Sequence, residues 1–132
     1  MPSIQQFTRA LHITATSEMV DRNPNMPDSE RMDHYRVVLR RGRKQLTVYF
    51  SMGVAISREP SAEDVLDCLA SDASSVDNAA SFEDWAGELG YDTDSRKAER
   101  IYKVCERQAM RLRNFLGDQE NYETLLYQTE RA

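Results

Sequence analysis

The residue types that most often do chemistry are represented in this 132-residue chain by 22 acids, two histidines and two cysteines. Asp92 and Asp94 have the spacing that opens a calcium-binding loop, but the sixth position of that loop has no glycine and its twelfth is Lys103. Helix capping explains the two aspartates better. His12 and His34 have no cysteine or histidine at metal-ligand spacing, and no glycine-rich phosphate motif, nucleophile elbow or Cys–His pair is present. The sequence predicts no catalytic residue, no metal site and no cofactor.

Five cations recur at helical spacing in the second half of the chain. Successive members are four, three, four and four residues apart, and they cover about 80° of a helical wheel. We call them the basic ridge: Arg96, Arg100, Lys103, Arg107 and Arg111. Three interpretations are open, namely a solvated outer face, surface pairing with the chain's own acids, and a docking ridge for phosphates or an acidic partner.

Charge is segregated along the chain although the net charge is only −5. Residues 59–94 contain no base and carry −11, between a first segment of +4 and a following segment, 95–116, of +5. Ten acids of the negative segment form what we call the acidic block: Glu63, Asp64, Asp67, Asp72, Asp77, Glu83, Asp84, Glu88, Asp92 and Asp94. Such clustering favours a basic partner, for example a nucleic-acid-binding protein whose groove the acids occupy. The alternative is solubility together with favourable charge at helix N-termini.

A second basic group surrounds a glycine. Arg41, Arg43 and Lys44 flank Gly42, which suits the positive φ of a tight hairpin turn. With Tyr49 exposed nearby, these residues could contact nucleic acid. Charge that protects a sheet edge from association explains them without a ligand, and we favour that explanation.

Alternation of apolar and polar residues predicts three strands in the first half, at residues 7–19, 34–40 and 45–51. Residues 21–33 contain two prolines and indicate a long loop. The inward positions of the second and third strands are Tyr35, Val37, Leu39, Leu46, Val48 and Phe50. A sheet of this size needs other elements to cover its apolar face.

Helical spacing of apolar residues predicts these covering elements near 61–73, 81–89 and 95–116, with a break over 71–80 and a short last helix around 122–129. We therefore expect an α+β fold, in which a three-stranded antiparallel sheet is followed by three to four helices packed on one face. The length suits a single domain over 1–132, with a sheet half at 1–58 and a helical half at 59–132.

The chain has no apolar run of membrane-spanning length and its N-terminus lacks the core of a signal peptide. We expect a cytoplasmic protein with no membrane partner. Cys68 and Cys105 are expected to be reduced, half-buried thiols, because a disulfide scaffold would need more cysteines. The oligomeric state is left open.

Three segments together carry a resemblance: SMG at 51–53, EDVLDCLASDA at 63–73 and FEDWAGELGYDTDSRKAERIYKVCERQAMRLRNFLG at 82–117. The chain resembles a family of small proteins encoded by bacteriophages and prophages, and DRNPNM at 21–26 and MDHYRV at 32–37 extend the likeness over most of its length. The resemblance brings no active-site residue with it.

What the resemblance implies is a phage accessory protein in a bacterial host cell. Small acidic phage proteins are often inhibitors of host machinery, including CRISPR effectors, and the acidic block agrees with that role. The first expectation is a non-enzymatic module that binds a host protein through charged surfaces. The alternative is a nucleic-acid-binding accessory protein that uses the basic hairpin and ridge, and a small hydrolase with a carboxylate site is a third class.

Overall fold

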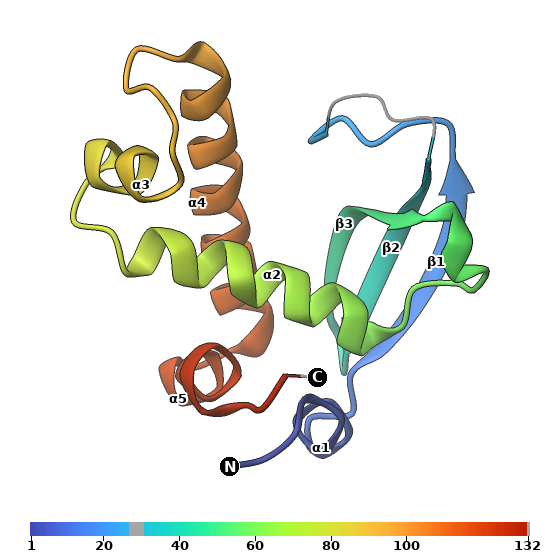
Figure 1. Cartoon of the computed structure of the whole chain (residues 1–132). Coiled ribbons are helices and arrows are strands. Elements are labelled where there is room, and N and C mark those ends of the chain that lie inside the picture. The colour runs from blue at the N-terminus through green and yellow to red at the C-terminus, as the bar shows by residue number, and fades with distance from the viewer. Residues whose placement is uncertain (27–30, 132) are drawn as a thin grey trace. The chain divides into compact units, whose positions relative to one another are not determined.

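The computed structural model describes residues 1–26 and 31–131 of the chain (Figure 1). Its elements, in chain order, are α1 (Ile4–Ala10), β1 (Thr14–Val20), β2 (Met32–Arg41), β3 (Lys44–Gly53), the 3₁₀ turn η1 (Val54–Ile56), α2 (Ala62–Asp77), α3 (Phe82–Glu88), α4 (Arg96–Leu116), α5 (Gln119–Glu123) and the π-helical turn η2 (Thr124–Gln128). The predicted α+β class is confirmed. The chain separates into two compact units, residues 1–67 with the C-terminal residues from 128, and residues 68–127. Each unit is described by itself below.

The first unit contains the three-stranded antiparallel sheet, in the order β1-β2-β3 (Figure 1). Arg41 pairs with Lys44 across a two-residue turn, and Gly42 at the first turn position has φ 59°, as this hairpin geometry requires. The turn fixes the register, so that Val37 faces Val48 and Leu39 faces Leu46. The predicted inward positions are buried, apart from Phe50, which is half-buried.

The first strand was predicted to begin at residue 7, and this is wrong, because residues 4–10 form helix α1. Ser3 accepts a hydrogen bond from the Gln6 amide, and the Gln6 side chain accepts one from the Ser3 amide. This capping box starts the helix. Ile4 and Phe7 are buried on one side of α1, and β1 begins only at Thr14.

The C-terminal residues return to this unit. Ile4 donates its amide to the Glu130 carbonyl (3.1 Å), and Glu130 donates to the Pro2 carbonyl (2.8 Å). Arg131 Nε lies 3.1 Å from Asp67 Oδ1 at the end of the α2 portion that belongs to the unit. The two ends of the described chain are thus held together by backbone hydrogen bonds.

The second unit is helical. The end of α2 and the start of the last helix differ from the prediction. Helix α2 does not break at 71 but runs to Asp77, because Val76 in its last turn packs against the core that contains Trp85. The Ser75 hydroxyl donates to the Asp72 carbonyl (2.7 Å) within the helix. The predicted short last helix is present as α5, which continues into η2.

An aromatic core holds the unit together. Trp85 is 2 % exposed and stacks on Tyr91 with ring centroids 5.6 Å apart, while the ring of Tyr102 approaches its edge at 5.2 Å. Phe82 completes the cluster, and Trp85 Nε1 donates to Ser75 Oγ (3.2 Å). Trp85 is therefore a core residue of this unit.

Candidate functional site

The basic ridge lies on the outward face of α4. Ser95 caps this helix by accepting a hydrogen bond from the Ala98 amide, and Gly117 ends it with φ 87°. The opposite face is buried through Ala98, Cys105 and Leu112. The side chains of the ridge therefore project from a helix whose position is fixed by its apolar face.

Four of the five ridge residues are exposed, namely Arg96, Arg100, Lys103 and Arg107. Lys103 pairs with Glu99 on the same helix (3.2 Å), which is an exposed pair worth about 0.3–0.5 kcal/mol. Within residues 1–26 and 31–131, Arg96, Arg100 and Arg107 form no ion pair. These three guanidinium groups are consequently available to an anionic group from outside the chain.

Arg111 differs from the rest of the ridge. It is half-buried and donates from Nη1 to Gln108 Oε1 (3.2 Å). Burial, followed by the charge of Arg107, lowers the pKa of Arg111. Arg111 therefore packs along α4 beside Gln108 and does not extend the row of exposed cations.

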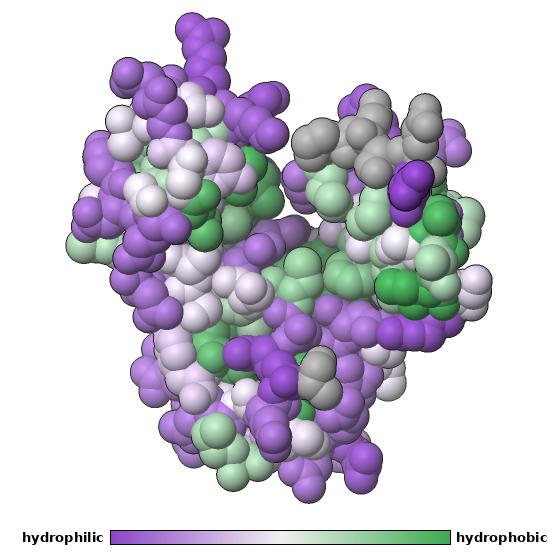
Figure 2. Space-filling view, in the orientation of Figure 1, coloured by the Kyte–Doolittle hydropathy of each residue, from purple (hydrophilic) through white to green (hydrophobic). Residues whose placement is uncertain are grey.

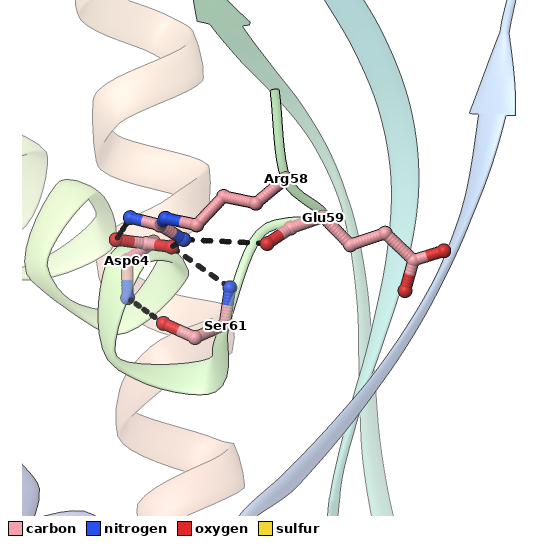
Figure 3. Close-up of polar contacts among 4 residues, drawn as sticks. All are labelled: Arg58, Glu59, Ser61 and Asp64. Atoms are coloured by element: carbon pink, nitrogen blue, oxygen red, sulfur yellow. Dashed lines mark hydrogen bonds and ion pairs between the residues drawn. The ribbon is translucent and has the colours of Figure 1, made fainter. Parts of the chain in front are cut away.

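The members of the acidic block differ in their exposure and in their partners. Asp64 lies in the first turn of α2 and forms two hydrogen bonds with Ser61, the residue before the helix (Figure 3). Ser61 N donates to Asp64 Oδ2 (2.8 Å), and Asp64 N donates to Ser61 Oγ (3.2 Å). These reciprocal bonds form a capping box at the N-terminus of α2. Arg58 also binds both carboxylate oxygens of Asp64, at 2.5 and 3.1 Å, and this hydrogen bonding lowers the pKa of Asp64.

Two further members of the block are also engaged by the chain's own residues. Asp67 pairs with Arg131. Asp77 Oδ2 accepts a hydrogen bond from Tyr122 (2.8 Å) and lies 3.8 Å from Arg113, whose guanidinium sits 4.3 Å above the Tyr122 ring. Arg131 and Arg113 therefore compensate the negative charges of Asp67 and Asp77 within the protein.

Asp72 is a separate case. It is half-buried on α2, and burial raises its pKa to about 6. The thiol of Cys105 on α4 is buried. This burial, followed by the negative charge of Asp72, raises the pKa of Cys105 to about 12. Cys68 is exposed and Cys105 is buried, so the expectation of two half-buried thiols is wrong, although neither cysteine forms a disulfide with a described residue.

The remaining exposed acids are concentrated on α3 and the turn after it: Glu83, Asp84, Glu88, Asp92 and Asp94. None of these five forms an ion pair with another described residue. We call them the α3 acids. Figure 2 shows hydrophilic residues along the margin of the helical unit where α3 lies and at the end where α4 begins. Glu63, the last member of the block, is half-buried on α2.

The hairpin cations belong to the first unit. Arg43 and Lys44 are exposed and Arg41 is half-buried. Tyr49 is 38 % exposed and pairs in register with Arg36, whose guanidinium forms an ion pair with Glu18. The sheet therefore presents one exposed tyrosine on this face, as the sequence predicts, which is little aromatic surface for stacking bases.

A polar cluster in the sheet was not foreseen. His34 Nδ1 and Ser51 Oγ are joined by a hydrogen bond of 2.6 Å, and Asn23 Nδ2 donates to the same oxygen at 3.0 Å. The two-residue turn at Gly42 already places His34 opposite Ser51, so the hairpin register could have revealed the pair. A serine nucleophile needs a third group that orients the histidine; Asn23 contacts the serine instead, and the cluster ties the start of the loop to the sheet.

Other site classes gain no support from the described residues. They contain no group of three or more histidine, cysteine or acidic side chains that could hold a metal ion. In the same part of the chain, no helix has the length and apolar character needed to cross a membrane. Comparison with models of known protein families, with curated proteins and with solved structures gives no match. The resemblance to phage proteins stays a prediction.

Proposed function

We propose that the protein is a non-enzymatic binding module whose contact surface lies on residues 68–127. The observation that carries the proposal is the row of exposed arginines on α4, at Arg96, Arg100 and Arg107, that no described carboxylate neutralises. About eleven residues of α-helix separate the first from the last, which corresponds to roughly 16 Å along the axis. A row of this length engages several anionic groups of one partner.

The charge around the ridge favours a protein over a nucleic acid. Asp92 and Asp94 immediately precede α4, and Glu99 and Glu106 are exposed on it. Residues 68–127 contain twelve acids and seven bases, so this unit carries the whole net charge of −5. A continuous phosphate backbone would be repelled by these acids, whereas a protein surface of mixed charge can pair with the ridge and the α3 acids at once.

The resemblance to phage and prophage proteins supplies the class of partner. A host protein is the target of the proposed module, and a nucleic-acid-binding defence effector, such as a CRISPR effector, has the basic groove that the α3 acids would occupy. Binding there would inhibit the effector by excluding its nucleic acid.

Reversal of the three exposed arginines tests the ridge. In the triple variant Arg96→Glu, Arg100→Glu and Arg107→Glu, we expect capture of the partner from bacterial lysate to fall at least about tenfold, which corresponds to about 1.4 kcal/mol. Helical content should be unchanged, because all three side chains are exposed. Reversal of the exposed Arg43 on the hairpin is the matched control. Equal capture by the triple variant and the wild type would remove the ridge from the proposal.

The alternative function, nucleic-acid binding, rests on the same three arginines together with the basic hairpin. It predicts direct binding to DNA or RNA by the purified protein, with an affinity that falls steeply as salt rises. Fluorescence anisotropy with labelled oligonucleotides at two salt concentrations distinguishes the two functions. A salt-sensitive signal that is lost in the triple variant would favour the alternative.

A further inference from the structure

Strand β1 is an edge of the sheet whose outer side has no partner in the described structure. It pairs with β2 through all seven residues, from Thr14 opposite Arg40 to Val20 opposite His34 (Figure 1). Within residues 1–26 and 31–131, no backbone hydrogen bond reaches β1 from another element. The amides and carbonyls on its outer side are available to another strand.

The edge also lacks the features by which proteins usually prevent strand addition. It contains no proline and no lysine, and its ladder with β2 is regular, without a bulge. Its one charged residue, Glu18, is engaged by Arg36 of the neighbouring strand. Met19 is 63 % exposed on the side of β1 that faces the core of the sheet. An edge of this kind favours association.

We propose that β1 pairs antiparallel with β1 of a second copy of this chain, about a two-fold axis at Ser17. This register uses the whole strand and keeps each residue opposite one from the same side of the sheet. Ser17 faces its symmetry mate, Thr16 faces Glu18, Ala15 faces Met19 and Thr14 faces Val20. The two three-stranded sheets become one continuous sheet.

The sequence of β1 is complementary to itself in this register. On the solvent side, Arg40 donates to Thr16 Oγ1 (2.7 Å) within each copy, and Glu18 pairs with Arg36. The dimer places Thr16 of one copy directly opposite Glu18 of the other, so that the row across the junction contains Arg40, Thr16, Glu18 and Arg36 with no two like charges adjacent. The same arrangement occurs twice by symmetry.

On the core side, the small Ala15 leaves room for a larger neighbour. Met19 of the second copy lies opposite it and loses most of its exposure to water. Ala15 and Ser17 are each half-buried already and would be covered further. In the dimer, the small side chain of Ala15 thus makes room for the Met19 side chain of the other copy.

A second copy is favoured over an unrelated extended peptide because the complementarity is found within β1 itself. The consequence for binding is that each dimer carries two copies of residues 68–127. Two linked contact surfaces raise the strength of binding to any partner that presents two sites. Pairing through β1 is independent of the proposed function, since mass and cross-linking report it without any partner.

Light scattering coupled to gel filtration tests the dimer with the full chain. We expect a mass of about twice 15.2 kDa at high protein concentration. Thr16→Glu places a second carboxylate opposite Glu18 at both symmetric positions and should weaken the dimer at least about tenfold. The double variant Thr16→Glu with Glu18→Thr restores a Glu–Thr pair at each position and should restore the dimer. A wild type that stays monomeric at several hundred micromolar, or a dimer insensitive to Thr16→Glu, would overturn the proposal.

Two further variants guard against loss of folding and check the register. Met19→Lys changes an exposed side chain and should give a folded monomer by circular dichroism. In a Cys68→Ser background, Ser17→Cys should form an intermolecular disulfide when oxidised glutathione is added, because each thiol faces its mate. Gln45→Cys, on the exposed side of β3, is the control and should cross-link only slowly. Equal rates for the two cysteines would contradict pairing at Ser17.

Discussion

Asp72 shows how much a single residue can depend on packing. Its side chain is half-buried on α2, and no described cation pairs with it. The sequence suggested only that Asp72 is one of many acids, because helix α2 was expected to break at residue 71. Because the helix continues, Asp72 lies one turn before Val76, which packs on the aromatic core, and its charge acts on the buried Cys105. The burial of a charge is a tertiary effect that local periodicity does not reveal.

This burial predicts a pH dependence of stability. The pKa of Asp72 is about 6 in the folded protein and close to 3.8 when the chain unfolds, so the folded state favours the protonated carboxyl. The stability from this group is complete below about pH 4 and is lost as pH rises through 6. One pKa unit corresponds to about 1.4 kcal/mol, so keeping the Asp72 carboxylate charged in the folded protein at neutral pH costs on the order of 2–3 kcal/mol of stability.

Asp72→Asn should therefore raise the free energy of unfolding by about 1–3 kcal/mol at pH 7 and leave it almost unchanged at pH 4. Urea unfolding followed by the fluorescence of Trp85, the one tryptophan, measures both values. Asp94→Asn, at an exposed position, is the control and should have little effect at either pH. A variant that is destabilised at pH 7 would mean that the charged carboxylate has a favourable partner.

Among the elements, those with strong local signals were predicted and those with competing signals were not. The ends of α4 follow from Ser95 and Gly117, and the hairpin follows from Gly42. Helix α1 was missed because the apolar residues at 7, 11 and 13 also fit an alternating strand. Ser3 and Gln6 carried the capping signal that identifies the helix. Capping residues should take priority over alternation when a segment is this short.

Helix α3 is followed by a turn that is centred on Gly90. Gly90 has φ 78°, its amide donates to the Gly87 carbonyl (3.2 Å), and the Tyr91 amide donates to Ala86 (2.8 Å). This pair of bonds is the Schellman arrangement, which needs a left-handed residue at the position of Gly90. It also turns the chain so that the Tyr91 ring stacks on Trp85.

Two glycine substitutions in and after α3 should have opposite effects. A Cβ would meet no atom within 4 Å at either Gly87 or Gly90, so the difference lies in the backbone. Gly90→Ala forces an alanine into the left-handed region and should destabilise the protein by about 1–2 kcal/mol. Gly87→Ala removes a glycine from a helix and should stabilise it by about 0.5–1 kcal/mol. Thermal unfolding followed at Trp85 measures both, and shifts of the same sign would contradict the role of Gly90.

At the scale of the whole molecule, the charge pattern was visible in the sequence but its distribution in space was not. The ridge faces outward as its helical spacing indicated. The acidic block divides into acids held by Arg58, Arg131 and Arg113, the exposed α3 acids, and the half-buried Glu63 and Asp72. Whether an acid pairs with a basic side chain depends on which distant segment folds back beside it, as Arg131 does beside Asp67. Counting charges along the sequence cannot predict such pairs.

Helix α2 is the element that the two units share, because it runs without a break through Asp67 and Cys68. Its first turns bury Val65 and Leu66, and its later turns bury Ala73. An α-helix transmits order along its axis through hydrogen bonds between residues four apart. Breaking α2 in the middle should consequently weaken both units and not only one of them.

Ser71→Pro is the variant that tests this coupling. Proline removes the amide that bonds to the carbonyl of Asp67 and clashes with that carbonyl, at a cost of about 3 kcal/mol or more. Ser71 is exposed, so Ser71→Ala is a matched control that should be neutral or slightly stabilising. Trp85 fluorescence reports on residues 68–127, and hydrogen exchange of the β2 amides reports on the sheet. We expect Ser71→Pro to lower the unfolding free energy by a similar amount at both probes; unchanged protection of β2 would mean that the sheet is stable without α2 being continuous.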